Sequence, residues 1–207
     1  MTAEESQQIY QLNVIADDYI RTVKLPQFKS KNPVAVIYVG APGSGKTYLT
    51  QKLTTEFPFL LISHERIQSF LTPTATFFER GQELIYDLVE IVIPKLISLG
   101  VCSLFDLNFK VRARRNQLRG KVFESGGHLL TIYLNCPVSF AFNQIQAANR
   151  KIVAGEKTGF VIDRAFFQFE VSTTEPPNLD ENAINFDISK DSGQINKIIA
   201  FLKPFFA

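Results

Sequence analysis

The residues whose types and spacing suggest chemistry most directly form one short segment, Gly40-Ala41-Pro42-Gly43-Ser44-Gly45-Lys46-Thr47. The segment matches the spacing G-x-x-x-x-G-K-[ST] of a phosphate-binding loop. Glycine tolerates positive φ and has no Cβ, so the backbone can turn tightly around an anion with its N–H groups pointing inward. A helix that begins near Gly45 would add the positive end of its dipole. The spacing therefore predicts a site for the phosphates of ATP.

The side chains at the end of this segment have expected roles in that site. Lys46 would bridge the β- and γ-phosphates and act in catalysis, and Thr47 would hold Mg²⁺ through its hydroxyl. Tyr48, the next residue, is included in the predicted nucleotide site. The alternative is a glycine-rich turn with a purely structural role.

An acidic residue is predicted at the same edge of the fold. Asp106 follows the apolar residues Leu104 and Phe105, which are expected to belong to a strand. In open α/β sheets, ligands bind at the carboxyl ends of the strands. We therefore predict that Asp106 contacts the Mg²⁺ ion through water. The alternative is that Asp106 caps the helix that follows.

A second carboxylate follows another predicted strand, in Ser63-His64-Glu65-Arg66. Glu65 would face the same crevice, where it could take the proton of an acceptor hydroxyl as a general base. A solvent-exposed loop charge is the alternative for Glu65. His64 is a second, weaker candidate for the base.

Two groups of basic residues complete the candidates. One group consists of Arg112, Arg114, Arg115 and Arg119, and the other of Arg150, Lys151 and Lys157. Such runs are usually solvated faces, but a positioned arginine also stabilises a phosphoryl group during its transfer. We predict that Gly155–Gly159 belongs to a mobile lid and that Arg150 closes over the γ-phosphate.

The elements that must position these residues alternate along the chain. Apolar, β-branched runs typical of buried strands occur at Val34–Val39, Phe59–Ile62, Cys102–Phe105, Leu130–Leu134 and Ile184–Ile188. Helical patterns are predicted at 3–24, 46–56, 82–98, 111–124, 138–154, 162–171 and 194–202, and loops at 155–159 and 173–182. This alternation predicts an α/β fold with a parallel sheet and right-handed crossovers.

Composition narrows the class of protein. The chain has 207 residues, 45% of them hydrophobic, which predicts one ordinary domain. Its formal net charge of +2 gives no indication of a basic surface for binding long nucleic acids. Cys102 and Cys136 are expected to be small buried residues of strands. The chain opens on polar, acidic residues, and its apolar runs are far shorter than the ~20 residues that span a bilayer. We therefore expect a cytoplasmic protein with no membrane association.

With these residues in view, the chain resembles the predicted ATP-binding kinases grouped with polynucleotide 5′-kinase and zeta toxin. The likeness runs from about Val34 to Ile188. Besides the phosphate loop, it rests on Ser63-His64-Glu65-Arg66-Ile67-Gln68, Phe105-Asp106-Leu107-Asn108-Phe109, Arg114-Arg115, Leu134-Asn135-Cys136-Pro137, Asn149-Arg150, Gln168-Phe169-Glu170 and Glu175-Pro176-Pro177.

The resemblance implies a three-layer P-loop kinase fold with a five-stranded parallel sheet in the order 2-3-1-4-5. It implies a kinase domain over residues 31–207, with residues 1–30 as a helical extension. The family's second-strand segment reads Ser-x-Asp-x-x-Arg, with Asp as the base and Arg on the substrate phosphate. In this chain Glu65 replaces that Asp and Gln68 replaces that Arg.

The function predicted from these observations is transfer of the ATP γ-phosphate to a hydroxyl acceptor, with ATP and Mg²⁺ bound. A nucleic-acid 5′ end, a sugar nucleotide and a small metabolite all remain open as acceptors, as does the oligomeric state. The alternative is an ATP-binding or ATPase regulatory module without kinase activity, which Gln68 favours. A GTPase is disfavoured because Asn196-Lys197-Ile198-Ile199 lacks the acid of a guanine-reading Asn-Lys-x-Asp sequence.

Overall fold

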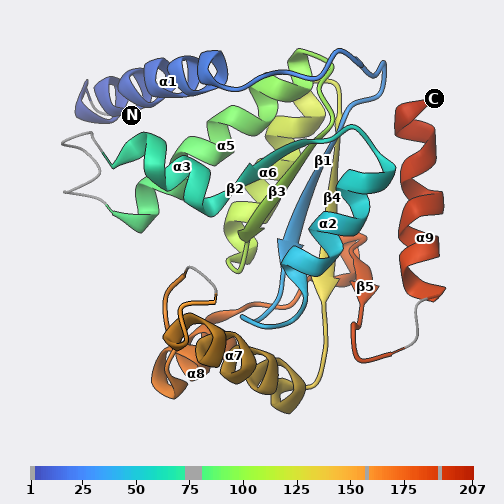
Figure 1. Ribbon diagram of the computed structural model, residues 1–207. Coiled ribbons are helices and arrows are strands. Elements are labelled where there is room, and N and C mark those ends of the chain that lie inside the picture. Colours follow the sequence, from blue (N-terminus) through green and yellow to red (C-terminus); the bar gives the residue numbers. More distant parts are fainter. Residues whose placement is uncertain (1–2, 73–80, 157–158, 191–192) are drawn as a thin grey trace.

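The computed structural model describes residues 3–72, 81–156, 159–190 and 193–207 (Figure 1). The strands are β1 (Val34–Val39), β2 (Leu60–Ser63), β3 (Ser103–Asn108), β4 (His128–Leu134) and β5 (Ile184–Phe186). The α-helices are α1 (Ala3–Thr22), α2 (Lys46–Glu56), α3 (His64–Leu71), α5 (Gln82–Ser98), α6 (Arg112–Glu124), α7 (Val138–Val153), α8 (Arg164–Thr173) and α9 (Gly193–Leu202). Two short 3₁₀ helices are η1 (Leu179–Glu181) and η2 (Lys203–Phe206).

These strands form one parallel five-stranded sheet in the order β2-β3-β1-β4-β5. The predicted sheet order is therefore confirmed. The central strand β1 is buried along its whole length and pairs with β3 on one side and β4 on the other. Its burial explains why the residues from Val34 to Val39 are apolar at every position rather than at alternate positions.

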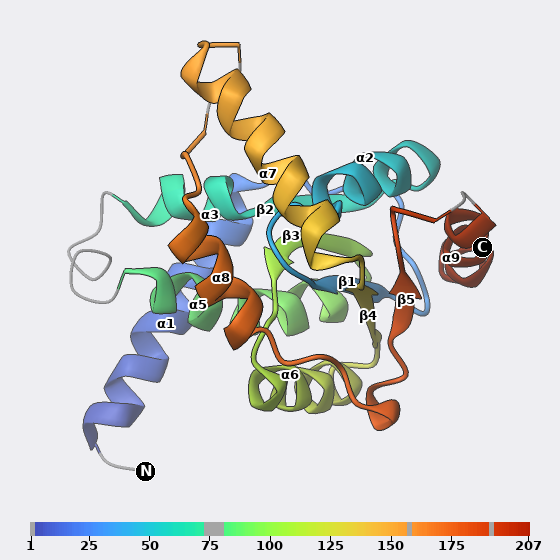
Figure 2. The same cartoon turned by 90° about the horizontal axis from the view of Figure 1, so that it is seen from below.

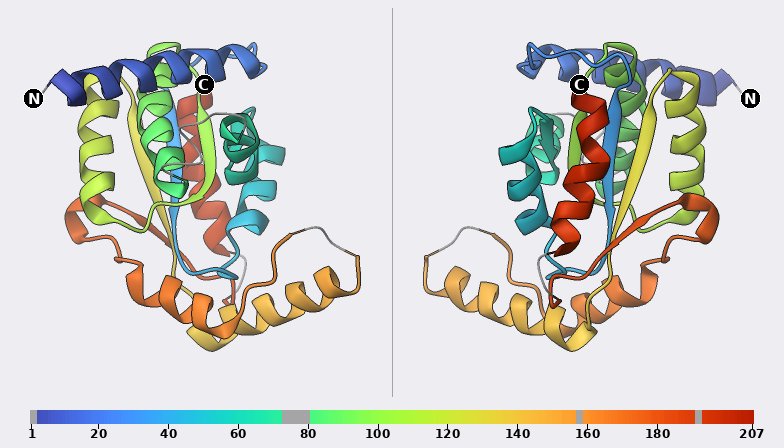
Figure 3. Two further views of the ribbon diagram at one scale, coloured as in Figure 1. Left: turned by 90° about the vertical axis from the view of Figure 1, so that its left-hand side faces the viewer. Right: turned by 90° about the vertical axis from the view of Figure 1, so that its right-hand side faces the viewer.

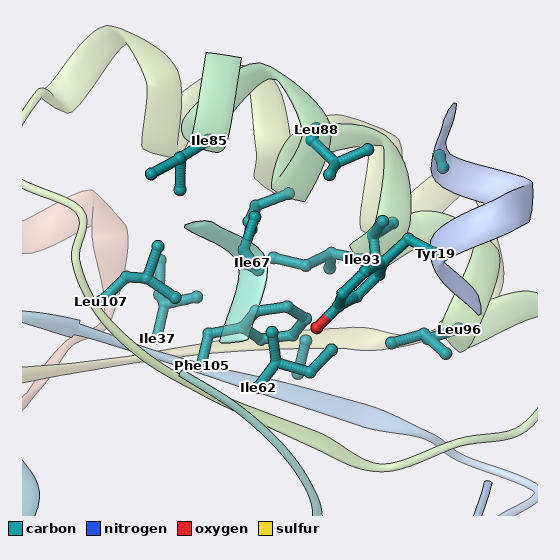
Figure 4. Packing of buried hydrophobic residues seen from close by; sticks show 14 of the residues in the cluster. Tyr19, Ile37, Ile62, Ile67, Ile85, Leu88, Ile93, Leu96, Phe105 and Leu107 are labelled. Atoms are coloured by element: carbon teal, nitrogen blue, oxygen red, sulfur yellow. The ribbon is translucent and has the colours of Figure 1, made fainter. Parts of the chain in front are cut away.

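Alternate residues of β1 supply two separate cores, one on each face of the sheet. Ala35 and Ile37 belong to the larger core, which includes apolar residues of α1, α3, α5 and α6. Figure 4 shows part of this packing, with Phe105 and Ile62 of the sheet beneath Ile67 of α3 and Leu88 of α5. Because side chains alternate along a strand, Val34, Val36 and Tyr38 point the other way.

The second core lies between the sheet and the helices α2 and α9. It contains Leu49 and Leu53 of α2 together with Ile198 and Leu202 of α9. Phe206 of η2 closes its edge by stacking on Phe57, with ring centroids 4.7 Å apart. The expected three layers, helices on both faces of a parallel sheet, are visible in Figure 1.

The helices α7 and α8 lie outside these layers, beyond the carboxyl ends of the strands (Figures 2 and 3). They have a small core of their own, formed by Ala141, Ile145 and Phe167. Asp163 begins α8 by accepting a hydrogen bond from the Phe166 amide at 2.7 Å. The pair therefore forms a separate layer over the edge at which ligands bind in parallel sheets.

The first helix packs along α5 at the opposite end of the molecule from α7 and α8 (Figure 1). Leu12, Ala16, Tyr19 and Val23 are buried in the larger core. The division between an extension at residues 1–30 and a kinase domain from residue 31 stays a prediction. Within the described ranges, no helix has the length and apolar character needed to cross a membrane.

Several predicted boundaries were wrong. Residues 64–71, which carried no predicted element, form α3, and β3 continues three residues beyond Phe105 to Asn108. Cys102 and Cys136 lie beside strands rather than in them, the first buried and the second half-buried. The predicted loop at 173–182 contains η1, whose residue Glu181 is buried. Within the lid segment, Lys157 and Thr158 lie outside the described residues.

Candidate active site

The loop between β1 and α2 has the backbone geometry of a cradle. Gly43 and Gly45 have φ angles of +78° and +99°, which side chains other than glycine rarely adopt. A Cβ on Gly43 would lie 2.2 Å from the carbonyl oxygen of Ala141 in α7, so the helix passes directly against the loop. Gly45 is the N-cap of α2, so the amide end of that helix faces the loop. The sequence requirement for glycine here is therefore both conformational and steric.

Lys46, the first residue of α2, folds back over this loop. Its Nζ donates hydrogen bonds to the carbonyl oxygens of Gly40 at 2.8 Å and Ala41 at 2.9 Å. Burial lowers the pKa of Lys46 to about 8, although the nearby carboxylates of Asp106 and Glu170 oppose that change. The ammonium group is thus held where it lacks full solvation, and a bound anion would stabilise its charge.

The loop also contains a polar atom with no partner. The hydroxyl oxygen of Ser44 is buried and has no hydrogen-bond partner among the described residues. The amide of Gly40 donates to Oδ1 of Asn108 at 3.1 Å, which ties the start of the loop to the end of β3. Buried polar groups are nearly always satisfied, so the free hydroxyl, the glycine cradle and Lys46 together fit a phosphate-bearing ligand.

Asp106 lies within β3, opposite Ser63 at the end of β2. The register between β1 and β3 shifts here, so that Ile37 pairs with Phe105 but Tyr38 pairs with Asn108. Burial raises the pKa of Asp106, and Glu65 adds to the increase, while Lys46 and a hydrogen bond with the Thr47 hydroxyl counter it. The alternative role as a helix cap is wrong, because Val111 is the N-cap of α6.

The donor set at Thr47 and Asp106 suits a hard divalent cation. Magnesium prefers oxygen ligands, and protein sites supply one or two carboxylates while phosphates and water supply the rest. No cluster of three or more His, Cys, Asp or Glu side chains able to hold a metal occurs within the described ranges. A hydroxyl and one carboxylate beside a phosphate loop therefore fit Mg²⁺ held jointly with a nucleotide, rather than a site made by protein alone.

Glu65 lies in the first turn of α3, so the alternative of a loop position is wrong. Ser63 caps the helix by accepting from the Arg66 amide at 3.3 Å. Glu65 is exposed, yet its charge contributes to the raised pKa of Asp106. His64 is bound to Gln82 of α5, with Nε2 2.7 Å from Oε1. Helix α3 thus places Glu65 close enough to Asp106 for the two charges to interact, while Gln68 is half-buried one turn later.

The two basic groups have different surroundings. In the first, the Arg115 side chain is fully buried, and its guanidinium donates to Glu181 at 2.6 and 2.9 Å and to the Phe109 carbonyl at 2.8 Å. These bonds hold the segment before β5 against α6, so Arg115 has a structural role.

Arg150 is exposed on the last turn of α7, nine positions after Ala141, or about 13 Å along the helix axis. The structure does not bring it to the loop.

Tyr48 and Lys151 are also on the surface. Tyr48 is exposed on α2, where the Lys52 ammonium lies 5.8 Å from the centre of its ring. Lys151 is exposed beside Arg150.

A cavity of about 590 Å³ lies beside the phosphate loop. Its aromatic lining comes from Tyr86, Phe109 and Phe166, its charged lining from Glu83, Lys110, Arg114 and Glu170, and the rest from His64, Gln82, Asn108 and Val111. Two lining residues connect the cavity to the loop. Asn108 accepts a hydrogen bond from the Gly40 amide, and the negative charge of Glu170 acts to raise the pKa of Lys46. A volume of this size suits a small-molecule ligand.

Sequence reasoning did not identify this cavity. Its lining residues belong to α3, α5, α8, the end of β3, the start of α6 and the connection between these last two, and most of these segments are far apart in the chain. The available signals were the polar residues at the start of α5, a largely apolar helix, and Lys110 two residues after the end of β3. Neither signal indicates which other segments lie nearby. The pocket is therefore recognisable only in the folded structure.

Solved structures with a similar fold include several kinases. A sugar kinase from Janibacter sp. HTCC2649 has a TM-score of 0.56 at 18% identity, covering 83% of this chain and 94% of that one. Kti12 from Chaetomium thermophilum, in complex with ADP-AlF3, has a TM-score of 0.59 at 15% identity, covering 84% and 100%. A fungal RNA kinase has a TM-score of 0.53 at 15% identity, covering 86% and 88%.

At these identities the likeness concerns the fold. No protein-family model matches the sequence, and no curated protein sequence matches it either. The predicted P-loop kinase fold is confirmed.

Proposed function

We propose that this protein is an ATP-dependent phosphotransferase that transfers the γ-phosphoryl group to an acceptor hydroxyl. One arrangement carries the proposal: a glycine cradle with Lys46 folded over it, Thr47 and Asp106 beside it, and a cavity of about 590 Å³ adjoining. The fold adds support, since the similar structures include a sugar kinase, an RNA kinase and a protein in complex with ADP-AlF3.

The phosphate loop would bind and orient the triphosphate. Backbone amides of residues 40–45, with Tyr48 at the helical end, would surround the phosphates, and the buried Ser44 hydroxyl would gain a partner. Lys46 would exchange its bonds to the Gly40 and Ala41 carbonyls for bonds to phosphate oxygens. Thr47 and Asp106 would hold Mg²⁺, which when bound neutralises charge on the β- and γ-phosphates.

The acceptor side would use Glu65. As the acceptor oxygen bonds to the γ-phosphorus, the bond from that phosphorus to the β,γ-bridging oxygen breaks and ADP leaves. The acceptor hydroxyl gives its proton to the Glu65 carboxylate, which later releases it to water. Glu65 suits this role because it is exposed at the start of α3, close enough to Asp106 to affect its pKa. The outer turns of α7 would form a lid, and Arg150 would supply its positive charge. For Arg150 to reach the γ-phosphate, these turns would have to move toward the phosphate loop.

The proposal is tested first at the phosphate loop. We expect Lys46→Ala to abolish binding of ATP with Mg²⁺ in calorimetric titration while circular dichroism shows a folded protein. Lys52→Ala, an exposed lysine on the same helix, is the matched control and should bind ATP normally. Unchanged affinity in a folded Lys46→Ala protein contradicts the assignment of the phosphate site.

The second test concerns transfer. Wild-type protein with γ-labelled ATP is screened against nucleic-acid 5′ ends, sugar nucleotides and small polyols, with release of free phosphate measured in parallel. Labelled product that requires Lys46 supports the phosphotransferase. Hydrolysis without transfer to any acceptor class supports instead an ATPase module that acts through a partner.

A further inference from the structure

The cavity beside the phosphate loop is lined by two cationic side chains, Lys110 and Arg114, and each forms an ion pair with carboxylates. The Lys110 ammonium lies 2.6 Å from Oε1 of Glu170 and 3.1 Å from the Thr173 hydroxyl. One guanidinium nitrogen of Arg114 lies 2.9 Å from Asp87 and 3.0 Å from Glu90. A side chain that binds phosphate needs N–H donors free to point at the phosphate oxygens. The Lys110 ammonium and one guanidinium nitrogen of Arg114 already face carboxylates.

The rest of the lining adds negative charge rather than positive charge. Glu83, in the first turn of α5, has no cationic partner in the described part of the chain. A phosphate monoester carries a charge of about −1.5 to −2 at pH 7. Placing such a group in this cavity would bring it beside Glu83 and Glu170 and would require one of the ion pairs to open. The cavity therefore disfavours an acceptor that already carries phosphate.

The uncharged part of the lining suits a ring with hydroxyl groups. Tyr86 and Phe109 meet edge to face, with ring centroids 5.9 Å apart, and Phe166 supplies an exposed apolar wall. The Tyr86 hydroxyl donates to the Asn108 carbonyl at 3.1 Å, and His64 pairs with Gln82. Aromatic faces take the C–H face of a ring, while the amide and imidazole groups and the carboxylates exchange hydrogen bonds with its hydroxyls.

We propose that the acceptor is an uncharged, polyhydroxylated small molecule, a sugar or a nucleoside without phosphate, bound against Tyr86 and Phe166. This inference rests on the proposed phosphotransferase function and names its acceptor class. The shared chemistry is a ring that carries hydroxyls and no anionic group. A terminal hydroxyl would then reach the edge of the cavity at Asn108, next to the phosphate loop.

The test compares each uncharged compound with its own phosphate ester. The full chain, with Mg²⁺ and a non-hydrolysable ATP analogue, is mixed with hexoses, pentoses or nucleosides, or with their monophosphates. Binding is measured by ligand-observed NMR, and transfer is measured separately with labelled ATP. We expect at least one uncharged compound to bind about tenfold or more tightly than its ester, as the loss of a charge-assisted bond would predict. The sugar and nucleoside arms identify which ring is preferred.

Paired variants locate the binding in this cavity. Phe166→Ala should weaken binding of the uncharged compound several-fold, whereas Phe123→Ala, an exposed phenylalanine of α6 outside this cavity, should not. Glu170→Gln should free Lys110 and improve binding of the ester relative to the uncharged compound. Glu90→Gln removes one of the two carboxylates that contact Arg114 and should likewise improve binding of the ester. This variant replaces Glu170→Gln in the test if Glu170→Gln does not fold.

The possible failures are distinguishable. Esters that bind as tightly as their uncharged parents overturn the inference, and so does a chain that binds the ATP analogue but no member of either class. Equal effects of Phe166→Ala and Phe123→Ala also overturn it, because binding would then lie elsewhere. Failure to bind the ATP analogue contradicts the proposed function itself, and the inference with it.

Discussion

The proton on Lys46 makes nucleotide binding depend on pH. Burial lowers its pKa to about 8 in the free protein, so the side chain is charged at pH 7 and increasingly neutral above pH 8. A bound triphosphate favours the ammonium form and raises this pKa. The complex therefore holds more protons than the free protein above pH 8, and affinity should fall as pH rises through that range.

We expect ATP binding to take up a proton at pH 8.5 but little at pH 7. Calorimetry in buffers of different ionisation enthalpy measures this uptake at each pH. Lys46→Arg is the control, because a guanidinium stays protonated at both pH values. Equal proton uptake by Lys46→Arg at pH 8.5 would assign the titration to another group.

Glu65 separates transfer from nucleotide binding. As a general base it should contribute about 10²–10⁴-fold to the transfer rate, so we expect Glu65→Gln to lower transfer by that factor with ATP affinity nearly unchanged. Glu124→Gln, an exposed glutamate at the end of α6, is the control. Rates are compared with the best acceptor from the screen. An intact transfer rate in Glu65→Gln would remove the general-base role.

At the scale of elements, η1 is joined to α6 by ion pairs of Glu181, and the pair with Arg115 is the one in which both side chains are fully buried. Burial acts to raise the pKa of Glu181, but hydrogen bonds from Arg115 and the Asn178 amide outweigh it and hold this pKa below its ordinary value of 4.5. The pair contributes stability above pH 4.5, and that contribution is lost as pH falls through the lowered pKa. Removing Arg115 alone would leave the buried Glu181 carboxylate with only longer ionic contacts, to Arg119 at 3.5 Å and to Arg112 at 3.9 Å.

We therefore expect Arg115→Ala to lower the free energy of unfolding by about 3–5 kcal/mol at pH 7, the usual cost of breaking a buried pair. Arg21→Ala, which removes an exposed pair with Asp18, should cost less than about 1 kcal/mol. Urea denaturation measures both. A small effect of Arg115→Ala at pH 7, or an effect that does not shrink in acid, would count against this account.

Helix α7 links the phosphate loop to the predicted lid. Ala141 touches Gly43, whereas Arg150 is exposed on the last turn. If the outer turns close over the γ-phosphate, Arg150→Ala should lower transfer by about 10²–10³-fold, the effect of losing one positioned donor, with a smaller effect on ATP affinity. Lys151→Ala, the exposed neighbour, is the control. Equal rates for the two variants would exclude a specific role of Arg150.

Elements were predictable where the signal was local. The phosphate loop is one continuous segment, and the apolar run Val34–Val39 directly indicates a central strand. Helix α3 was missed although Ser63 could cap it and Ile67 and Leu71 share one face, because eight residues give a weak periodic signal. The extension of β3 to Asn108 depends on the register shift against β1, which no local pattern records.

In the candidate site, too, features within one short segment could be predicted and contacts between distant segments could not. The positions of Lys46 and Thr47 at the phosphate loop follow from their spacing, and that of Asp106 from its place after an apolar run, while their roles stay predictions. The ion pairs of Lys110 and Arg114 could not be predicted, since Glu170 and Asp87 approach from other helices. Sequence alone shows Arg115 as one more surface arginine, and only packing shows that its side chain is fully buried.

At the scale of the whole molecule, α1 and the sheet share one core, so they should unfold together. The Tyr19 ring meets Phe70 edge to face at 5.1 Å, and burial raises its pKa to about 12. Tyr19→Ala should lower stability by about 3–5 kcal/mol, the usual cost of removing a buried aromatic ring. Tyr10→Ala, on the exposed face of α1, should cost less than about 0.5 kcal/mol.

Tyr19→Phe distinguishes the ring from its hydroxyl. The hydroxyl has no partner among the described residues, so its removal should be neutral or stabilising. Thermal and urea unfolding should each show one transition for all three variants. Two separate transitions, with Tyr19→Ala affecting only the first, would mean that residues 1–30 fold as an independent unit.

The central position of β1 has a consequence for synthesis on the ribosome. Val34 pairs with His128, roughly 90 residues later in the chain, and Ala35 pairs with Ser103. At about 5–20 residues per second, translation takes several seconds to deliver β3 and β4 after β1 has emerged. During that interval the nascent chain exposes six consecutive apolar residues, and the loop after them has no sheet to hold it. Nucleotide binding therefore cannot precede the emergence of β4, and release before that point would yield a fragment prone to aggregate.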